Sequence, residues 1–162
     1  MDKKVIVITG AGGILCSGFA KVLAKDGHKI ALLDLNLEAA EGFAKEIRED
    51  GGEAKAYSCN VLKKDSLEEV HQQILKDFGK CDILINGAGG NNPRGTCDHE
   101  TYEIGDEERD DIKTFFNLDP DGIGFVFNLN FLGTLLPSQV FVPDMIGKDG
   151  CSILNVSSMN AF

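Results

Sequence analysis

The 162-residue sequence lacks paired cysteines and has fewer basic than acidic residues, 16 against 26. Its five cysteines are odd in number and form no Cys-x-x-Cys pair, which argues against a zinc site and a disulfide framework. His28, His71 and His99 also lack ligand spacing and are interpreted as surface or structural residues. The formal net charge of −10 opposes binding to nucleic acid and to anionic membranes.

A transmembrane run and a signal peptide are not expected either. The apolar run from Val5 to Ile8 follows two lysines, but it is too short for a signal peptide and glycines interrupt it. Together with unpaired cysteines, this predicts a cytoplasmic protein with reduced thiols. A hydrophobic content of 43% is enough for the core of one domain.

What the sequence does contain is a buried-strand pattern that leads directly into glycines. Val5 to Ile8 is followed by Gly10, Gly12 and Gly13, and a helical pattern comes next. At such a turn the unpaired N–H groups and the positive end of the helix dipole are available to a pyrophosphate. An ordinary tight turn between a strand and a helix would explain the glycines equally well.

Asp34 decides between these two interpretations. It ends a second buried run, Lys29 to Leu33, about 20 residues past the glycines, where an acidic residue accepts hydrogen bonds from the adenosine ribose. A helix N-cap is the alternative role, but Asn36 is equally placed for it. No Arg or Lys stands nearby to neutralise a 2′-phosphate, so the sequence favours NAD over NADP.

Strand and helix patterns alternate along most of the chain. This alternation predicts an α/β fold, a Rossmann-type doubly wound parallel sheet of about five strands with helices on both faces. The whole chain, 1–162, is then one NAD-binding domain. The runs expected to form strands are residues 5–8, 29–33, 54–59, 81–85 and 152–156.

Three helices are expected between the first four strands, each with one apolar face. Asp65 and Glu68 have the spacing of a capping box at the start of the third helix. The expected faces are Ile14, Leu15, Phe19, Val22 and Leu23 in the first helix; Ala40, Phe43, Ala44 and Ile47 in the second; and Leu67, Val70, Ile74 and Phe78 in the third.

Residues 87–121 break this rhythm and are interpreted as an acidic insertion or lid around 90–120, mobile without substrate from about 91 to 105. The acidic cluster from Asp106 to Asp111 is interpreted as a solvated helix start, with a metal site as the alternative. Asp119 and Pro120 predict an N-cap followed by the first helical residue. The apolar helix that follows is expected to kink or divide at Pro137.

Four motifs, in order, resemble those of the short-chain dehydrogenase/reductase family. Thr9-Gly10-Ala11-Gly12-Gly13 resembles its glycine motif, and Asn86-Gly87-Ala88-Gly89 resembles its NNAG motif. Asn130 matches the family's helix asparagine, and Ser158 in Asn155-Val156-Ser157-Ser158 matches its catalytic serine. The runs NGAGGNNP and FNLNFLGTLLP resemble the D-mannonate oxidoreductase (fructuronate reductase) subgroup.

The resemblance implies hydride transfer between NAD and a sugar-acid alcohol or ketone, in a homo-oligomeric enzyme. Ser158 would hold the substrate oxygen, and Asn130 would bend its helix and bind a water through its carbonyl. The alternative role of Ser158 is to cap a turn at a strand end, and that of Asn130 is a buried helix amide bonded to a neighbouring strand. Residues 86–89 would then form a plain turn at a strand end. The residues implied to bind NAD are Thr9, Gly10, Gly12, Gly13, Ile14, Leu15, Asp34, Leu35, Asn60, Val61, Asn86, Gly87, Ala88 and Gly89.

The sequence departs from the family pattern in three residues. Cys16 replaces the third glycine and is expected to widen the packing of helix on strand. Asn60 replaces the Asp that contacts the adenine amino group, although its amide oxygen can still accept that bond. Gly87 replaces the second Asn of NNAG.

A fourth departure is an absence, because the family's Tyr-x-x-x-Lys pair does not occur. The tyrosines are Tyr57 and Tyr102, and the chain ends at Phe162. We therefore expect the first two-thirds of a domain, inactive alone. A non-catalytic dinucleotide-binding module remains an alternative. A methyltransferase-like domain is a further one, against which the NGAG and NVSS motifs argue.

Overall fold

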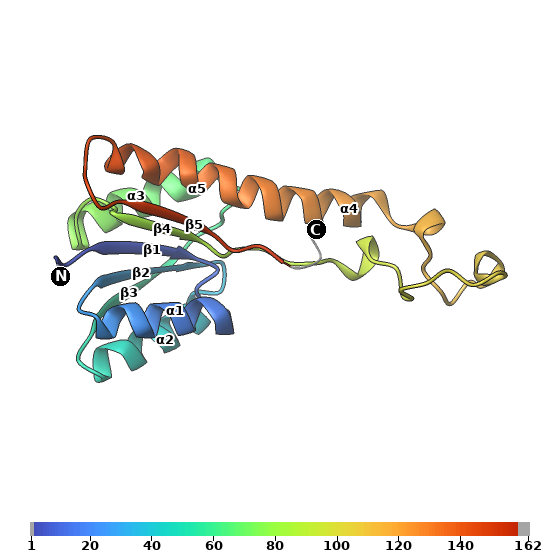
Figure 1. The fold of residues 1–162 in the computed structure, drawn as a ribbon, viewed down its shortest axis with the longest axis horizontal. Helices are drawn as coiled ribbons and strands as arrows, with labels where there is room; N and C mark the ends of the chain where they lie inside the picture. The colour runs from blue at the N-terminus through green and yellow to red at the C-terminus, as the bar shows by residue number, and fades with distance from the viewer. Residues whose placement is uncertain (1, 159–162) are drawn as a thin grey trace.

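The computed structural model describes residues 2–158 and shows a five-stranded parallel sheet with helices on both faces (Figure 1). The strand order is β3-β2-β1-β4-β5. This confirms the predicted fold class. The order reverses between β1 and β4, which is where open α/β sheets bind ligands, at the carboxyl ends of the strands. The strands are β1 (Val5–Thr9), β2 (Lys29–Asp34), β3 (Glu53–Ser58), β4 (Ile83–Asn86) and β5 (Ser152–Asn155).

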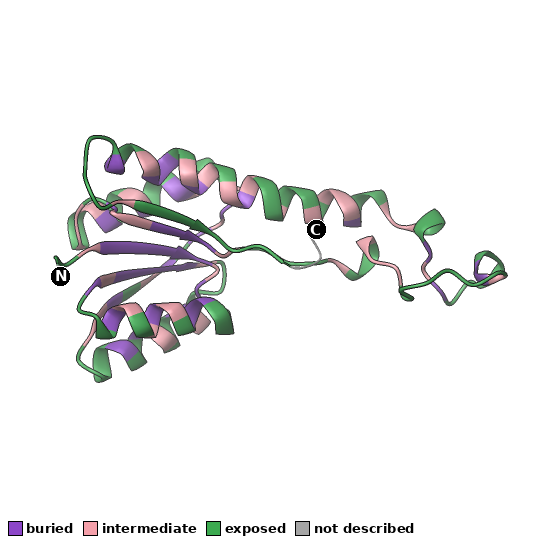
Figure 2. Ribbon diagram, viewed as in Figure 1, coloured by how far each residue is buried: buried purple, intermediate pink, exposed green. Residues whose placement is uncertain are grey.

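Alternate residues of β1 belong to two separate cores. Val5 and Val7 pack with α3 (Lys64–Asp77) and α5 (Gly133–Phe141) on one face of the sheet. Ile6 and Ile8 pack with α1 (Ile14–Lys25) and α2 (Leu37–Glu49) on the other. Figure 2 shows this strand buried along its length, whereas the edge strand β5 is exposed. Burial on both faces explains why the run is continuously apolar.

The expected apolar face of α1 is correct only for Phe19 and Leu23 and wrong for Ile14, Leu15 and Val22. Ile14 and Val22 are 91% and 61% exposed, and the buried residues are the small side chains Cys16, Ser17, Ala20 and Ala24. Phe19 and Leu23 pack only at the margin of the core. Helix α1 lies close to the sheet, so small residues fit under it and large apolar residues are left outside.

The expected face of α2 is correct, whereas the capping box of α3 is wrong. Asn36 caps α2 by accepting a hydrogen bond from Ala39 N at 3.2 Å. The N-cap of α3 is Lys63, which makes no side-chain cap, and Asp65 already lies inside the helix. The Ser66 hydroxyl accepts a hydrogen bond from Asn60 N at 3.1 Å, so the start of α3 is tied to the preceding turn instead.

The long apolar helix begins as expected but divides at a different place. Asp119 caps α4 (Pro120–Phe127) through Asp121 N. The irregularity is a π-helical turn at Asn128–Leu132, whereas Pro137 lies buried inside α5. Asn130 Nδ2 donates to Val126 O at 2.8 Å and so satisfies a carbonyl that the local change of helix type would leave unpaired.

Residues Pro120–Met145 are long and apolar enough, by length and composition alone, to cross a membrane. The second half of this stretch packs on the sheet, where Val140, Phe141 and Met145 are buried in the core. The first half exposes Phe127 and Phe131. Packing on the sheet accounts for the apolar second half, so we assign the stretch to the fold rather than to a membrane span.

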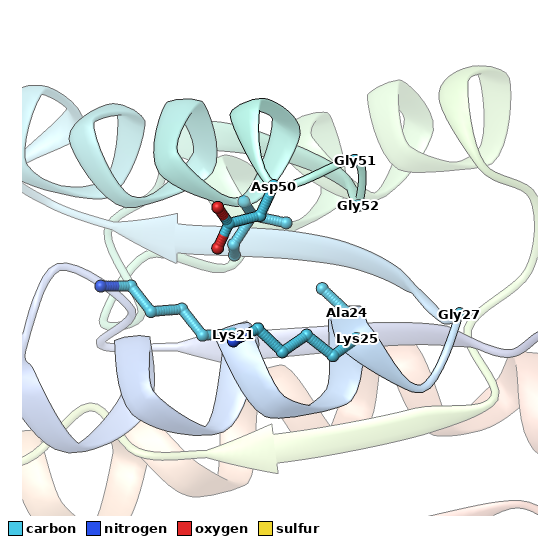
Figure 3. Close-up of a pocket in the computed structure, with 8 residues that line it drawn as sticks. Lys21, Ala24, Lys25, Gly27, Asp50, Gly51 and Gly52 are labelled. Atoms are coloured by element: carbon cyan, nitrogen blue, oxygen red, sulfur yellow. The ribbon is translucent and has the colours of Figure 1, made fainter.

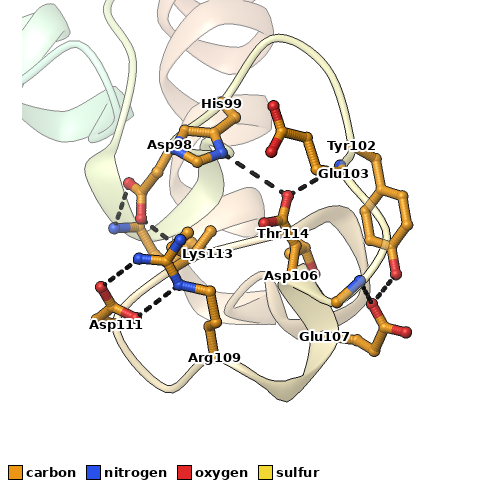
Figure 4. A network of polar contacts seen from close by, with 12 residues as sticks. Asp98, His99, Tyr102, Glu103, Asp106, Glu107, Arg109, Asp111, Lys113 and Thr114 are labelled. Atoms are coloured by element: carbon orange, nitrogen blue, oxygen red, sulfur yellow. Dashed lines mark hydrogen bonds and ion pairs between the residues drawn. The ribbon is translucent and has the colours of Figure 1, made fainter.

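Residues 91–119, here called the acidic arm, project from the sheet (Figure 1) and contain nine acidic and three basic residues. Figure 4 shows the ion pairs inside the arm, which include Lys113–Asp98 at 2.7 Å and Arg109–Asp111 at 2.9 Å. The expected solvated helix start is correct only in part, because a short helix begins here and the other acidic side chains are exposed, but Asp106 is not. Asp106 is buried in a short 3-10 turn, Asp106–Glu108, and accepts a hydrogen bond from Glu103 N at 3.0 Å. Within residues 2–158 no cluster of potential metal ligands occurs.

We predict that a glutamate-specific protease cuts first at the outer end of the arm, around Glu103 to Glu108. Ile104 is 99% exposed there, and few apolar contacts hold this segment. Mass spectrometry of early digests would identify the sites. Glutamates on α2 and α3, such as Glu46 and Glu68, are internal controls. First cuts in those helices would show that the arm is not the more mobile part.

Candidate functional site

The turn after β1 is shaped by backbone contact with the turn after β4. Gly10 has φ +67°, and a Cβ there would lie 2.7 Å from Gly87 O. Gly13 caps α1 without a side-chain hydrogen bond, and neighbouring Ile14 and Leu15 are exposed. The first N–H groups of α1 are therefore available to an anionic group such as a pyrophosphate.

Asp34, at the end of β2, is held beside this turn. Its Oδ2 accepts a hydrogen bond from Gly12 N at 2.9 Å, and its Oδ1 accepts one from Asn36 N at 2.8 Å. Each carboxylate oxygen retains acceptor capacity, which suits two ribose hydroxyls. Leu35 lies next to it and is exposed. Among the described residues no Lys or Arg forms an ion pair with Asp34 (salt bridges are found elsewhere).

Thr9 fixes the β4 turn to β1. The side chain is fully buried, and its Oγ1 accepts hydrogen bonds from Gly87 N at 3.1 Å and Ala88 N at 3.2 Å. Thr9 thus fixes the backbone of the motif that resembles NNAG to the end of β1.

Asn86 links the same turn to β5 and to α5. Its Nδ2 donates to Asn155 Oδ1 at 2.9 Å and to Ser138 Oγ at 3.2 Å. Its Oδ1 is buried and has no hydrogen-bond partner in the described part of the chain. No motif in the sequence indicates that Ser138 accepts this hydrogen bond from Asn86.

Asn130 joins the π turn to the loop after β4. Its side-chain amide pairs with the backbone of Gly90, accepting from N at 3.1 Å and donating to O at 2.8 Å. The partner is thus a loop and not a strand. The Asn130 carbonyl accepts the Thr134 hydroxyl at 3.1 Å and keeps a second lone pair. Ser158 lies three residues beyond β5, at the same end of the sheet.

Asn60 and Val61 follow β3 at this edge. Asn60 Oδ1 accepts a hydrogen bond from Leu62 N at 3.0 Å, so only part of its acceptor capacity remains for an adenine amino group. Val61 is buried and faces Gly133, where a Cβ would lie 3.2 Å from it. Asn60, like Asp34 and Thr9, thus uses part of its acceptor capacity within the protein.

The two tyrosines lie away from this site. Tyr57 donates to Asp77 at 2.8 Å, and Tyr102 donates to Glu107 inside the acidic arm. Burial, followed by the bond to Asp77, raises the pKa of Tyr57, and the bond to Glu107 raises the pKa of Tyr102 to about 12. Both groups therefore stay protonated at neutral pH, and neither serves as a proton-transferring base.

The structure joins two of the departures from the family pattern. A Cβ at Gly87 would lie 2.2 Å from Cys16 Sγ, so the sulfur uses the space that glycine leaves. Burial, followed by the charge of Asp34, raises the pKa of the Cys16 thiol. The thiol is therefore a neutral packing group at neutral pH. The two residues are far apart in sequence, and nothing in their pattern indicates the contact.

Two hollows lie away from the carboxyl ends of the strands. Figure 3 shows one of about 260 Å³, lined by Lys21, Lys25 and Asp50 where α1 and α2 end, at the amino ends of β2 and β3. Another, of about 360 Å³, lies in the acidic arm among Tyr102, Phe115 and Phe116. No predicted cofactor residue lines either hollow.

The sequence profile of the short chain dehydrogenase family matches residues 4–162. The chain is 59% identical over its full length to an uncharacterized oxidoreductase of Haemophilus influenzae, of which it covers 56%. It is 44% identical over 98% of its length to the uncharacterized oxidoreductase UxuB of Bacillus subtilis, of which it also covers 56%. The chain spans about half the length of the curated relatives it matches.

Solved structures agree with this comparison. A Haemophilus influenzae protein provisionally named a D-mannonate oxidoreductase, crystallised with bound NAD, has a TM-score of 0.95 and 59% identity over 100% of this chain and 57% of its own. An NAD⁺-bound xylitol dehydrogenase has a TM-score of 0.81 and 30% identity, over 98% of this chain and 54% of its own. Fold, motif order and family profile agree: the chain belongs to the short-chain dehydrogenase family.

Proposed function

We propose that the protein carrying this chain is an NAD-dependent oxidoreductase that interconverts a sugar-acid alcohol and its ketone, of the D-mannonate/D-fructuronate type. The observation that supports it most is the joint geometry of the uncapped α1 start and Asp34, which fits a pyrophosphate and an adenosine ribose. The NAD-bound relative named a D-mannonate oxidoreductase supports the substrate class.

The residues present fit NAD, which when bound supplies the hydride acceptor. Gly12, Gly13, Ile14 and Leu15 would hold its pyrophosphate at the start of α1. Asp34 and Leu35 would hold the adenosine ribose and cover the adenine, with Asn60 and Val61 beside them. The turn from Asn86 to Gly89, supported by Thr9 and Gly10, would lie along the ribose and pyrophosphate.

Substrate positioning is assigned to Ser158, whose hydroxyl would donate to or accept from the reacting oxygen. Asn130 would maintain the helix irregularity and leave its carbonyl available to a water molecule. The acid-base group is a Tyr whose pKa, about 10 when unperturbed, a neighbouring Lys lowers. Neither tyrosine of the 162 residues is placed for that role, so we propose that these residues alone do not turn over substrate.

We further propose a cytoplasmic homo-oligomer that binds neither nucleic acid nor membrane. Phe125, Phe127 and Phe131 are exposed along α4 and the π turn, and such apolar surfaces favour association between subunits. The acidic charge supports the exclusion of polyanionic partners. Size measurement by light scattering tests the oligomer.

The function is tested by expressing the complete reading frame that contains this chain and following NADH formation with D-mannonate. Turnover with the sugar acid and NAD is expected. The 162-residue chain, verified by mass, is expected to show weak NAD binding at best and no turnover. NAD binding by the complete protein without oxidation of any sugar acid or polyol would favour the second candidate, a non-catalytic binding module. The engagement of Tyr57 by Asp77 and of Tyr102 by Glu107 supports that candidate.

A further inference from the structure

Arg94 stands where the loop after β4 enters the acidic arm. Its N donates to Asn92 Oδ1 at 2.9 Å, and its carbonyl accepts from Asp119 N at 3.1 Å. Gly122 packs so closely on this backbone that a Cβ there would lie 2.7 Å from the carbonyl carbon of Arg94. The backbone of Arg94 is therefore fixed between an asparagine turn and the start of α4.

The Arg94 side chain, in contrast, is accessible. It is 59% exposed and makes one ion pair, from Nε to Asp119 Oδ2 at 3.2 Å. Ion pairs this exposed contribute about 0–1 kcal/mol. Asp119 keeps its hydrogen bond from Asp121 N when Arg94 turns away. Among the described residues, the Nη atoms of Arg94 have no hydrogen-bond or ion-pair partner. A second carboxylate can therefore engage the guanidinium.

No other cation of the arm is comparable. Arg109 makes two hydrogen bonds to Asp111, at 3.2 and 2.9 Å, and Lys113 is tied to Asp98. With nine acidic residues in residues 91–119, the surroundings repel an anionic ligand except at Arg94. The chain thus places one accessible guanidinium in the loop that leads from β4 into the acidic arm.

The place of Arg94 in the loop after β4 is also relevant to a sugar acid. Arg94 contacts Gly122, and Gly122 lies about 12 Å along the helix axis from Asn130, which holds the loop after β4. A hexonate has its carboxylate several bonds from a secondary hydroxyl. Arg94 also follows Gly90 by four residues, and the backbone of Gly90 pairs with the Asn130 side chain, so the guanidinium belongs to the loop that Asn130 holds.

We propose that Arg94 binds the carboxylate of the substrate and thereby selects sugar acids over neutral polyols. This assignment rests on the proposed function. The guanidinium exchanges its exposed pair with Asp119 for two parallel N–H···O bonds to the substrate carboxylate, a geometry that Lys cannot reproduce. Arg94 is then a specificity-determining residue, and hydride transfer itself does not involve it.

The test uses the complete protein and its NAD complex. Arg94→Gln should raise the KM and the Kd of D-mannonate by about 10- to 100-fold, because a charge-assisted pair is lost, with a much smaller change in kcat. Arg94→Lys should recover part of that loss. Arg109→Gln, which removes a cation from the same arm, should leave all constants unchanged. The Kd of NAD should not change in any variant.

The measured constants of Arg94→Gln decide whether Arg94 binds the substrate carboxylate. A KM for D-mannonate within twofold of wild type in Arg94→Gln would overturn the assignment of Arg94. An equal loss of NAD affinity in Arg94→Gln would also overturn it, by revealing a structural role. A wild-type enzyme that oxidises neutral polyols but no sugar acid would overturn the proposed function, and the assignment with it. Selective loss of D-mannonate binding supports both.

Discussion

Replacing Gly87 with alanine is expected to lower the free energy of unfolding by about 1–3 kcal/mol, because an added methyl group overpacks the core. The new Cβ would lie 2.2 Å from Cys16 Sγ and 3.0 Å from Thr9 O. Neither neighbour gives way easily, since Cys16 is buried in α1 and Thr9 lies in the central strand. Urea unfolding of the complete protein measures the loss.

If the clash with Cys16 causes the loss of stability, the two positions must be energetically coupled, and a double-mutant cycle measures that coupling. Cys16→Ala removes the sulfur, so the double variant should be more stable than the two separate losses predict, by about 1–2 kcal/mol of coupling. Gly18→Ala is the matched control, because a Cβ at Gly18, in the same helix, meets nothing within 4 Å. It should stabilise slightly, by about 0.5–1 kcal/mol. Additive losses at positions 16 and 87 would contradict the proposed contact.

The pair also shows what a sequence pattern conceals. Each departure is visible when taken alone: Cys16 where glycine is usual, Gly87 where asparagine is usual. The missing side chain of Gly87 leaves room for the sulfur of Cys16. This depends on how close the helix lies to the end of the strand, which a local sequence pattern does not reveal. The expectation that Cys16 widens the packing left out the space that Gly87 provides.

The central sheet could be predicted because its strands are buried on both faces. Val5 to Ile8 must be apolar at every position, and the alternation of such runs with helices leaves few other topologies. The face of α1 could be predicted only in part. Large apolar side chains suggested that Ile14 and Val22 would be buried. Because the helix lies close to the sheet, the small residues Ala20 and Ala24 are buried instead.

Helix starts and breaks were less predictable than strands. Asp119-Pro120 is a local signal and proved correct, since the cap depends on one side chain and its neighbours. The Asp65 box was wrong because the helix begins earlier, with Lys63 at the N-cap, so Asp65 is already inside it. The division expected at Pro137 was wrong: Pro137 lies inside α5, and the irregularity is the π turn, where Asn130 Nδ2 bonds to Val126 O.

Asp34 is the residue whose replacement should change cofactor choice most. In wild type we expect NAD to be preferred over NADP by roughly 30-fold or more, since a like charge at close range costs several kcal/mol. Both carboxylate oxygens are fixed by backbone N–H groups of Gly12 and Asn36, so the carboxylate cannot turn away from a 2′-phosphate. The described residues provide no Lys or Arg partner for Asp34 that would offset the repulsion.

Asp34→Ala should therefore narrow the NAD/NADP ratio of kcat/KM to within a few-fold, mainly through tighter NADP binding and partly through weaker NAD binding. Because the variant also frees two backbone donors, Asp34→Asn is the more conservative partner: it removes the charge and keeps an acceptor. Asp26→Ala removes the same charge from the far end of α1 and should leave the ratio unchanged. Equal affinity for both cofactors in wild type, or an equal change in the ratio for Asp26→Ala, would show that net charge rather than the fixed carboxylate governs the choice.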